Sequence, residues 1–460
     1  MRDRACSATW RLAAVAVAVA LLFTPAPALA AAPRAVKGPY LTELDDHGVV
    51  VRFQLEGAAT AVVRVVRDDG AGGAKTFTSS NVSGVQLARV TGLEAATRYG
   101  YSVQAGAAAV GAGHFFTAQA QGSTVPTTFL VYGDDRTDDA AHAAIALAMA
   151  GVPSDFLVQT GDMVAYGGSD QEWQRFFDIE RSLLVDRPIF AAIGNHELVD
   201  DAAGAAFARY FAAFDPAAGH APPPPYSTAR VGNVRLFLLN TMREWQGSEE
   251  RAWLDRALAQ SDAEGDAVWR IAVMHHGPWS AGPHGPNKQL LEAHVPELLA
   301  AHKIDLLLAG HDHDYERGDA QLKYIVSGGG GAPLYPAHPT ATTRKVESVH
   351  HFVAVTAEAR VLRIEARRVD GSVIERCAFS RGGPWDCDAA ASPDASPTGG
   401  DAGHTPAAPS SAPAPPPPSS TRSSLCTCAA PGLSGGNGAW FGVGLAALAL
   451  AVAGRSRRRG

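Results

Sequence analysis

The sequence lacks three features that would each point to a particular class of protein. It has no excess of basic residues, since 39 Lys and Arg stand against 46 Asp and Glu and the formal net charge is -7. Neither end has an unbroken apolar run of the roughly 20 residues that a membrane-spanning helix needs. The glycine-rich run at 328–332 has no Lys-Ser/Thr pair of the kind that holds nucleotide phosphates. These absences argue against a nucleic-acid partner and a nucleotide-binding loop, and they make a membrane span marginal.

The N-terminus has the pattern of a secretory signal. Several arginines begin the chain, an apolar run follows at 12–23, and Ala28-Leu29-Ala30 offers a small-residue cleavage site. Residues 1–30 are therefore predicted to be a signal peptide, and the protein is predicted to be exported. A membrane anchor is the alternative, but the apolar run is short and prolines follow it directly.

The chain has only five cysteines, and one of them, Cys6, would leave with the signal peptide. Cys377 and Cys387 lie ten residues apart on either side of a Gly-Gly-Pro segment, in a chain predicted to be exported. This spacing favours a local disulfide at the end of the last folded domain over two free thiols.

Residues 36–118 are predicted to form a small all-β domain, because short β-rich runs such as 49–53 are separated by glycine and aspartate turns. The segment at 90–103 resembles the Gly-Leu, Thr-x-Tyr-x-Tyr segment of fibronectin type III domains. By that resemblance, Tyr99 and Tyr101 are structural residues without a chemical role.

From 125 to 380 the pattern changes to apolar strands that alternate with amphipathic helices. Strands are predicted at 128–133, 156–160, 189–193, 234–239, 268–274 and 304–309, and helices at 139–150 and 171–184. Buried strands joined by helices indicate an α/β layered domain. Ligand sites in such sheets lie beyond the C-terminal ends of the strands, which is where the candidate functional residues fall.

Five loops that follow predicted strands carry residues able to bind a metal. They are Gly133-Asp134, Gly161-Asp162, Gly194-Asn195-His196-Glu197, Met274-His275-His276 and Gly310-His311-Asp312-His313. A single Gly-Asp turn or His-x-His pair is usually structural. Five such loops, each at the end of a strand, indicate one shared metal site.

The residue types suit the hydrolysis of a phosphate ester. Two cations about 3.5–4 Å apart can hold phosphoryl oxygens and lower the pKa of an attacking water, and they need a bridging carboxylate with oxygen and imidazole donors around it. Asp162 is the natural bridge, Asp134 and His313 would complete one metal site, and Asn195, His275 and His311 would complete the other. His276 is expected to support the site, although a one-residue shift would exchange it with His275. If 311–313 is extended, both imidazoles point the same way and Asp312 points outward.

These residues resemble the motif set of the calcineurin-like metallophosphoesterases, and their layout is most similar to the purple acid phosphatase-like branch. That branch also has a fibronectin-like β domain before the catalytic domain, and the resemblance covers about 36–380. It implies a four-layer α/β fold in which a β-sandwich lies between helical layers. It also implies two metal ions per chain and a small phosphate-ester substrate.

Two positions depart from the family pattern. Many metallophosphoesterases have a histidine ligand two residues after the first aspartate, whereas this chain has Arg136, which cannot bind a cation but could contact phosphate. Purple acid phosphatases have a tyrosine ligand three residues after the bridging aspartate, a position that is Ala165 here. Tyr166 could replace it only if the loop bulges by one residue. We therefore expect a colourless enzyme that binds iron, zinc or manganese.

His196 and His284 are the candidates for handling the substrate, together with Arg136 and Asn195 as phosphate contacts. His196 directly follows Asn195, and in the family this position stabilises the transition state or protonates the leaving group. His284 lies in a loop rich in glycine and proline, and an exposed loop histidine is its alternative interpretation.

The composition changes again at the C-terminus. Residues 388–425 are rich in Ala, Pro, Ser, Asp and Gly and are predicted to be a disordered linker. Residues 426–460 contain two cysteines, a glycine-rich spacer, an apolar stretch and terminal arginines, and they resemble the C-terminal sorting tags of exported myxobacterial proteins. Such a tail would attach the protein to the membrane or cell surface, and a plain membrane anchor is the alternative.

The sequence thus predicts an exported phosphomonoesterase of broad specificity. A phosphodiesterase or nucleotidase would use the same residues, because substrate choice lies in the surrounding loops. A non-catalytic surface binding protein is a third hypothesis. The complete set of ligands argues against it, because a decayed enzyme would be expected to lose ligands first.

Overall fold

The structure is a computed structural model, and it describes residues 33–57, 60–213, 224–263 and 268–387. This part of the chain contains two four-stranded sheets, a six-stranded sheet and a seven-stranded sheet. The predicted signal peptide (1–30), linker (388–425) and tail (426–460) lie outside the described residues. Within the described ranges, no helix is long and apolar enough to cross a membrane.

The first eight strands form two antiparallel sheets, in the orders β1-β2-β6-β5 and β4-β3-β7-β8. Their bounds are β1 Arg34–Thr42, β2 Val49–Glu56, β3 Ala61–Arg67, β4 Lys75–Thr78, β5 Ser80–Val82, β6 Val85–Val90, β7 Arg98–Ala105 and β8 Ala108–Phe116. Tyr99 and Tyr101 are buried on β7, and the Tyr99 hydroxyl accepts a hydrogen bond from Glu94 N at 3.0 Å. The all-β prediction for this region is confirmed.

The six-stranded sheet has the order β11-β10-β9-β19-β20-β21, and the seven-stranded sheet has the order β12-β13-β14-β15-β17-β16-β18. In the first, the bounds are β9 Thr127–Tyr132, β10 Phe156–Gln159, β11 Ile189–Ala191, β19 His351–Ala357, β20 Val361–Arg368 and β21 Val373–Ser380. In the second, they are β12 Ser227–Val231, β13 Val234–Leu238, β14 Trp269–Val273, β15 Leu306–Ala309, β16 Tyr315–Asp319, β17 Lys323–Ser327 and β18 Thr343–Glu347. The strands predicted from the apolar runs are all present. The charged strand β16 was not predicted.

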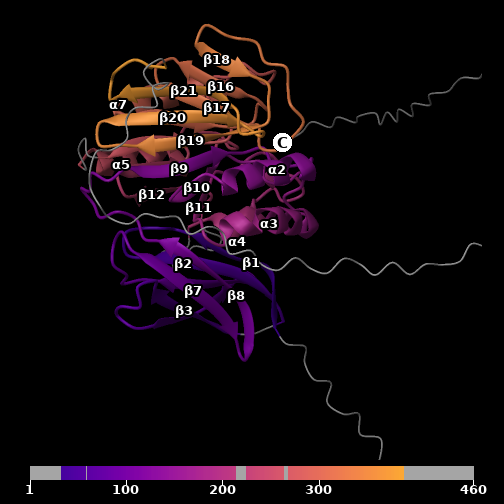
Figure 1. Ribbon diagram of the computed structural model, residues 1–460. Coiled ribbons are helices and arrows are strands. Elements are labelled where there is room, and N and C mark those ends of the chain that lie inside the picture. Colours follow the sequence, from indigo (N-terminus) through magenta and orange to yellow (C-terminus); the bar gives the residue numbers. More distant parts are fainter. Residues whose placement is uncertain (1–32, 58–59, 214–223, 264–267, 388–460) are drawn as a thin grey trace, which may run out of the picture. The chain divides into compact units, whose positions relative to one another are not determined.

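Helices cover the outer face of each large sheet. They are α2 Asp139–Ala150, α3 Asp170–Leu184, α4 Ala205–Phe211, α5 Glu249–Asp262, α6 Lys288–Glu292 and α7 Val295–Ala301, with a short 3-10 turn η1 at His196–Leu198. The N-terminus of α2 is capped by Asp138, whose side chain accepts from two backbone N–H groups, and Ser169 caps α3 in the same way. Figure 1 shows α2 and α3 beside the strands β9 to β11. Both predicted helices are therefore confirmed.

Alternate residues of the inner strands face two different layers. On β9, Phe129 and Val131 pack in the core shared by the two large sheets, whereas Leu130 and Tyr132 pack against α2 and α3. On β14, Ile271 faces the shared core, and neighbouring residues pack against α5 to α7. Because both faces are buried, these strands are apolar along their whole length. The result is the predicted four-layer arrangement of helix, sheet, sheet and helix.

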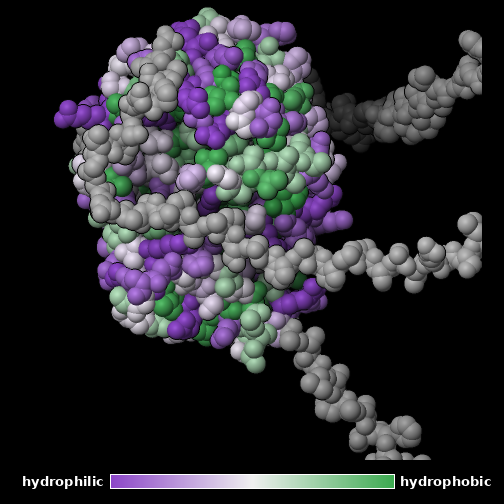
Figure 2. Space-filling model, viewed as in Figure 1, coloured by the Kyte–Doolittle hydropathy of each residue, from purple (hydrophilic) through white to green (hydrophobic). Residues whose placement is uncertain are grey.

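On the face drawn in Figure 2, hydrophilic and hydrophobic residues are mixed. Hydrophobic residues gather where α2 lies in Figure 1, and Leu147 on that helix is 76% exposed.

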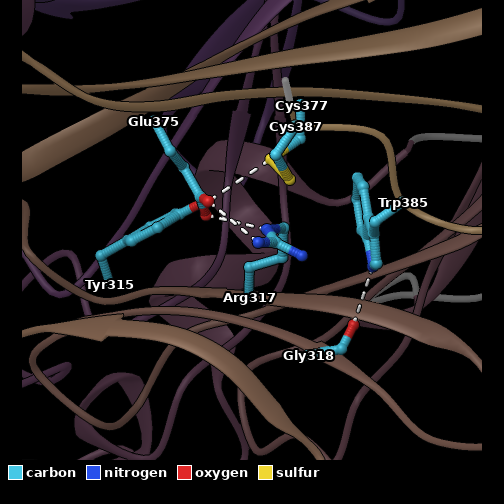
Figure 3. Close-up of a disulfide and its surroundings, with 7 residues drawn as sticks. All are labelled: Tyr315, Arg317, Gly318, Glu375, Cys377, Trp385 and Cys387. Carbon is cyan, nitrogen blue, oxygen red and sulfur yellow. Dashed lines mark hydrogen bonds and ion pairs between the residues drawn. A yellow bond between two sulfur atoms is a disulfide. The ribbon is translucent and has the colours of Figure 1, made fainter. Parts of the chain in front are cut away.

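Cys377 and Cys387 form a disulfide, as predicted (Figure 3). It ties the segment after β21 back onto that strand, where Ala378 and Asp386 also form a β-bridge. Arg317 on β16 forms an ion pair with Glu375 at 2.8 Å beside the disulfide, and the Trp385 indole donates to Gly318 O at 3.2 Å. The disulfide therefore holds the segment after β21 against that edge strand of the six-stranded sheet, where Trp385 also contacts β16 of the seven-stranded sheet.

The double variant Cys377→Ala/Cys387→Ala is expected to lower the free energy of unfolding by about 2–3 kcal/mol, because it frees a short closed loop in the unfolded chain. Urea unfolding of both proteins with and without reductant measures this. The wild type should fall to the level of the variant when it is reduced, and the variant should not respond. A wild type whose midpoint ignores the reductant would contradict the structural role.

Candidate metal centre

The six predicted metal ligands lie at the C-terminal ends of parallel strands in the two large sheets. They follow β9 (Asp134), β10 (Asp162), β11 (Asn195), β14 (His275) and β15 (His311 and His313). Parallel strands present their C-terminal ends at one edge of a sheet. The fold therefore brings together loops that are far apart in the sequence.

His275 and Asn195 form the first half of the site. His275 Nδ1 lies 2.9 Å from the carbonyl oxygen of Thr160, so Nδ1 carries the proton and Nε2 is free to bind a metal. Nε2 lies 3.1 Å from Asn195 Oδ1 and 3.3 Å from Asp162 Oδ1. Burial alone would lower the pKa of His275, but the Asp162 and Asp134 carboxylates outweigh it and raise this pKa to about 9. The negative charge of these two carboxylates would also attract a metal cation.

His276 and His311 complete this half. His276 Nε2 lies 3.2 Å from Asn195 Oδ1, and the His276 and His311 rings are 3.8 Å apart. Burial and the neighbouring His275 lower the pKa of His276 to about 3, and the same causes hold the pKa of His311 far below its usual value. Both rings are thus neutral at pH 7, which is the form that binds a metal, whereas His275 would lose a proton on binding one. His276, expected to play a supporting role, has its Nε2 among the ligand atoms.

Asp134 and His313 form the second half. His313 Nδ1 lies 2.6 Å from Pro333 O, so Nε2 again carries the lone pair, and it lies 3.5 Å from Asp134 Oδ1. Asp134 is fully buried, and its Oδ1 has no hydrogen-bond partner among the described residues. A buried carboxylate oxygen without a donor is costly unless a cation faces it. These donors therefore fit a metal ion.

Asp162 lies between the two halves. Its Oδ1 accepts a hydrogen bond from His196 N at 2.9 Å and faces His275, while its Oδ2 faces Arg136. Burial alone would raise the pKa of Asp162, but His275 and His196 hold it well below its usual value. This position suits the predicted bridging role.

Arg136 points into the site. Its Nε donates to Asp162 Oδ2 at 3.1 Å, and its Nη2 lies 3.4 Å from His313 Nε2. Its side chain is only 14% exposed. The residue that stands where many relatives have a histidine ligand therefore contacts two of the expected ligands directly.

The two substrate-handling candidates face the site from different loops. His196 Nδ1 lies 2.8 Å from Ala165 O, which leaves Nε2 free, 3.9 Å from Asp162 Oδ2. His284 lies with its ring 4.0 Å from the His311 ring, and its side chain is 42% exposed. Both imidazoles thus lie beside the ligand cluster and remain accessible.

The expectation that Asp312 points outward is wrong. Asp312 is 1% exposed, its Oδ1 lies 2.7 Å from His284 Nδ1, and its Oδ2 accepts from the Ser280 hydroxyl. The expected extended segment is instead a tight turn, because His311 has a φ of 74° and Asp312 N donates to Gly310 O. Asp312 therefore turns inward and orients His284.

Two tyrosines lie near the loops of the site. Tyr166 is 52% exposed. Tyr335 was not among the predicted site residues, but its ring stacks on that of His313 with centroids 4.0 Å apart, and its centroid lies 5.3 Å from that of His284. Tyr335 belongs to the loop between β17 and β18, and no motif in the sequence marks it.

Glu197 is a second residue whose role the motif alone did not reveal. It is fully buried, and its carboxylate accepts from Asp162 N at 2.9 Å, Met163 N at 2.8 Å and Gly194 N at 2.7 Å. It therefore joins the loop of the bridging aspartate to the loop of Asn195.

Three of the ligands have a backbone conformation that is rare for residues other than glycine. The φ angles are 59° at Asp134, 60° at Asp162 and 74° at His311. Such strain, of order 1 kcal/mol or more per residue, persists where function requires it.

Glycines also let the backbone pass close to the site. Gly161 is required before Asp162, because a Cβ there would lie 2.6 Å from His275 Nδ1. The glycine-rich run passes equally close, since a Cβ at Gly328 would lie 2.9 Å from Asp134 Oδ2.

The sequence pattern of the family described as calcineurin-like phosphoesterase matches residues 129–315, the stretch that contains all six predicted ligands. Residues 129–315 are a calcineurin-like phosphoesterase domain. The chain is 28% identical over 234 residues to purple acid phosphatase 3 of Arabidopsis thaliana, which is 44% of this chain and 63% of that protein. It is 26% identical over 220 residues to tartrate-resistant acid phosphatase type 5 of Sus scrofa, which is 41% of this chain and 62% of that protein. The chain thus spans less than two thirds of the length of these relatives.

Two solved structures share the fold. A purple acid phosphatase from yellow lupin seeds superimposes with a TM-score of 0.65 and 18% identity, covering 76% of this chain and 74% of its own. A structure of PhoD superimposes with a TM-score of 0.61 and 13% identity, covering 79% of this chain and 93% of its own. Both superpositions extend beyond the phosphoesterase domain, and at these identities they bear on the fold alone.

The variant Glu197→Gln is expected to lower the free energy of unfolding by about 1–3 kcal/mol and to weaken metal retention, because an amide N–H₂ would face backbone N–H donors. Urea unfolding and metal analysis after gel filtration measure the two effects.

Glu250→Gln is the matched control. Glu250 is also buried, and its Oε1 accepts from Asn240 N, a hydrogen bond that the amide oxygen of glutamine can keep. If the Glu197 variant kept its stability and metal as well as the Glu250 variant does, Glu197 would not organise the site.

Proposed function

We propose that this protein is an exported, metal-dependent phosphoester hydrolase that cleaves small phosphate monoesters. One observation carries the proposal: buried or half-buried metal-binding side chains converge from five loops. The ligand atoms of Asp134, Asp162 and His275 lie within 4.8 Å of one another, and so do those of His275, His276 and His311. The phosphoesterase domain that contains them supports the same chemistry. A non-catalytic binding protein would have no need of this constellation.

Bound metals would supply an activated water and positive charge for the phosphoryl oxygens. Asn195, His275 and His311 are proposed to hold one ion, Asp134 and His313 the other, and Asp162 to contribute to both. The carbonyl oxygens of Thr160 and Pro333 fix the orientation of His275 and His313, so that Nε2 of each ring faces the centre.

His284 is proposed to protonate the leaving oxygen. Asp312 holds its Nδ1, which leaves Nε2 for the substrate, and its exposure places the ring where an ester group could depart into solvent. His196 is proposed to stabilise the charge on the phosphoryl group, since its Nε2 is free beside Asp162. Asn195 would contact the phosphate from the metal side.

The metals are proposed to be divalent manganese, zinc or ferrous iron, which imidazole and carboxylate donors bind with little discrimination. Ala165 offers no donor atom, and Tyr166 is half exposed, which supports a colourless enzyme. We further propose that the protein is exported through residues 1–30 and retained at the membrane or cell surface through 426–460.

The variants Asp162→Asn, Asn195→Ala and His311→Ala are each expected to lower kcat/KM for p-nitrophenyl phosphate by at least about 100-fold, because each removes a metal ligand or, for Asp162→Asn, its negative charge. His284→Ala is expected to lose about 100-fold or more with an alkyl phosphate, and less with p-nitrophenyl phosphate, whose leaving group needs little protonation. The measurement is steady-state kinetics of the full-length protein with added metal.

His294→Ala is the control, because His294 is an exposed histidine whose side chain is 77% accessible. Retention of more than about a tenth of the activity in the Asp162 variant, a change of only ~1.4 kcal/mol in the barrier, would refute the bridging role. Faster cleavage of bis-p-nitrophenyl phosphate than of the monoester would replace the monoesterase proposal with a phosphodiesterase.

A further inference from the structure

The side chain of Arg136 contacts two atoms that the expected metal site needs as ligands. Its guanidinium lies between Asp162 Oδ2, at 3.1 Å, and His313 Nε2, at 3.4 Å. His313 belongs to the half of the site that contains Asp134, and Asp162 is the proposed bridge between the halves. By contrast, Asn195 Oδ1 lies beside His275 and His276, and the His311 ring packs on the His276 ring.

His313 Nε2 cannot accept a hydrogen bond from Arg136 and bind a metal at the same time. Because Nδ1 donates to Pro333 O at 2.6 Å, Nε2 has the only available lone pair of the ring. That lone pair accepts from Arg136 or binds a metal, but it cannot do both. A guanidinium held by a carboxylate and an imidazole also repels an incoming dication. A metal ion can therefore enter the Asp134 and His313 half only when Arg136 moves away.

We propose that Arg136 makes the two metal sites unequal. The site of Asn195, His275 and His311 binds a metal tightly, and the site of Asp134 and His313 binds a second one about 100-fold more weakly, because two hydrogen bonds of the guanidinium must first be broken. At limiting metal, the protein holds one ion, and Arg136 takes the place of the second. This inference rests on the phosphoesterase site proposed above, but it concerns metal binding and not turnover.

Titration of the full-length apoprotein with Mn²⁺, followed by calorimetry and by metal analysis after gel filtration, tests the proposal. The wild type is expected to bind in two separated steps and to retain one ion through the column. Arg136→Ala should bring the two steps to within about tenfold and retain two ions. Arg175→Ala removes an arginine from the surface of α3, with its side chain 46% exposed, and should leave the two steps separated.

Variants of His313 show which of the two metal-binding steps belongs to the site of Asp134 and His313. In the wild-type background, His313→Ala should abolish the weak step and leave the tight one, whereas in the Arg136→Ala background it should reduce the retained ions from two to one. Two equally tight ions in the wild type would overturn the proposal without any variant, and so would a weak step that Arg136→Ala leaves unchanged. No substrate is present, so a protein that binds metal in this way but hydrolyses no ester would refute the proposed function alone.

Discussion

The whole site depends on one electrostatic constraint, the concentration of lone pairs around the buried carboxylate of Asp162. His275 Nε2 lies 3.1 Å from Asn195 Oδ1 and 3.3 Å from Asp162 Oδ1, and Asp134 Oδ1 is buried without a donor among the described residues. Such an arrangement is unfavourable unless protons or cations lie between the atoms. Arg136 and the raised pKa of His275 show two ways in which the protein itself supplies positive charge there.

The fold supports this constraint with rigid elements. Apolar strands of the two sheets end close together. Asp134, Asp162 and His311 follow these strands in a left-handed backbone conformation, which turns their side chains inward. Glu197 then joins two of the loops through three backbone N–H groups. Carbonyl oxygens fix the rings of His275 and His313. The donors are thus positioned before any metal binds, which reduces the entropy cost of binding.

Sequence patterns predicted the parts of the structure that burial dictates. Strands buried on both faces appear as continuous apolar runs, so β9, β10 and β14 could be placed, and the ligands after them followed. The charged strand β16 could not, because Glu316 and Arg317 are buried through contacts with Ala281 N and Glu375, which are remote in the sequence. Asp312 was misjudged for a related reason: its direction depends on the backbone turn at His311 and on His284, neither of which periodicity reveals. Tyr335 comes from a loop with no regular pattern.

The central claim is that the buried donors form a binding site for metal cations. Its most direct test is the thermal unfolding of the full-length protein after chelation and after the return of Mn²⁺ or Zn²⁺. The account predicts a clear fall in Tm on chelation, recovery with metal, and little response in a His311→Ala variant that has lost a ligand. A Tm that is the same with and without metal, in a protein shown to be metal-free after chelation, would contradict it.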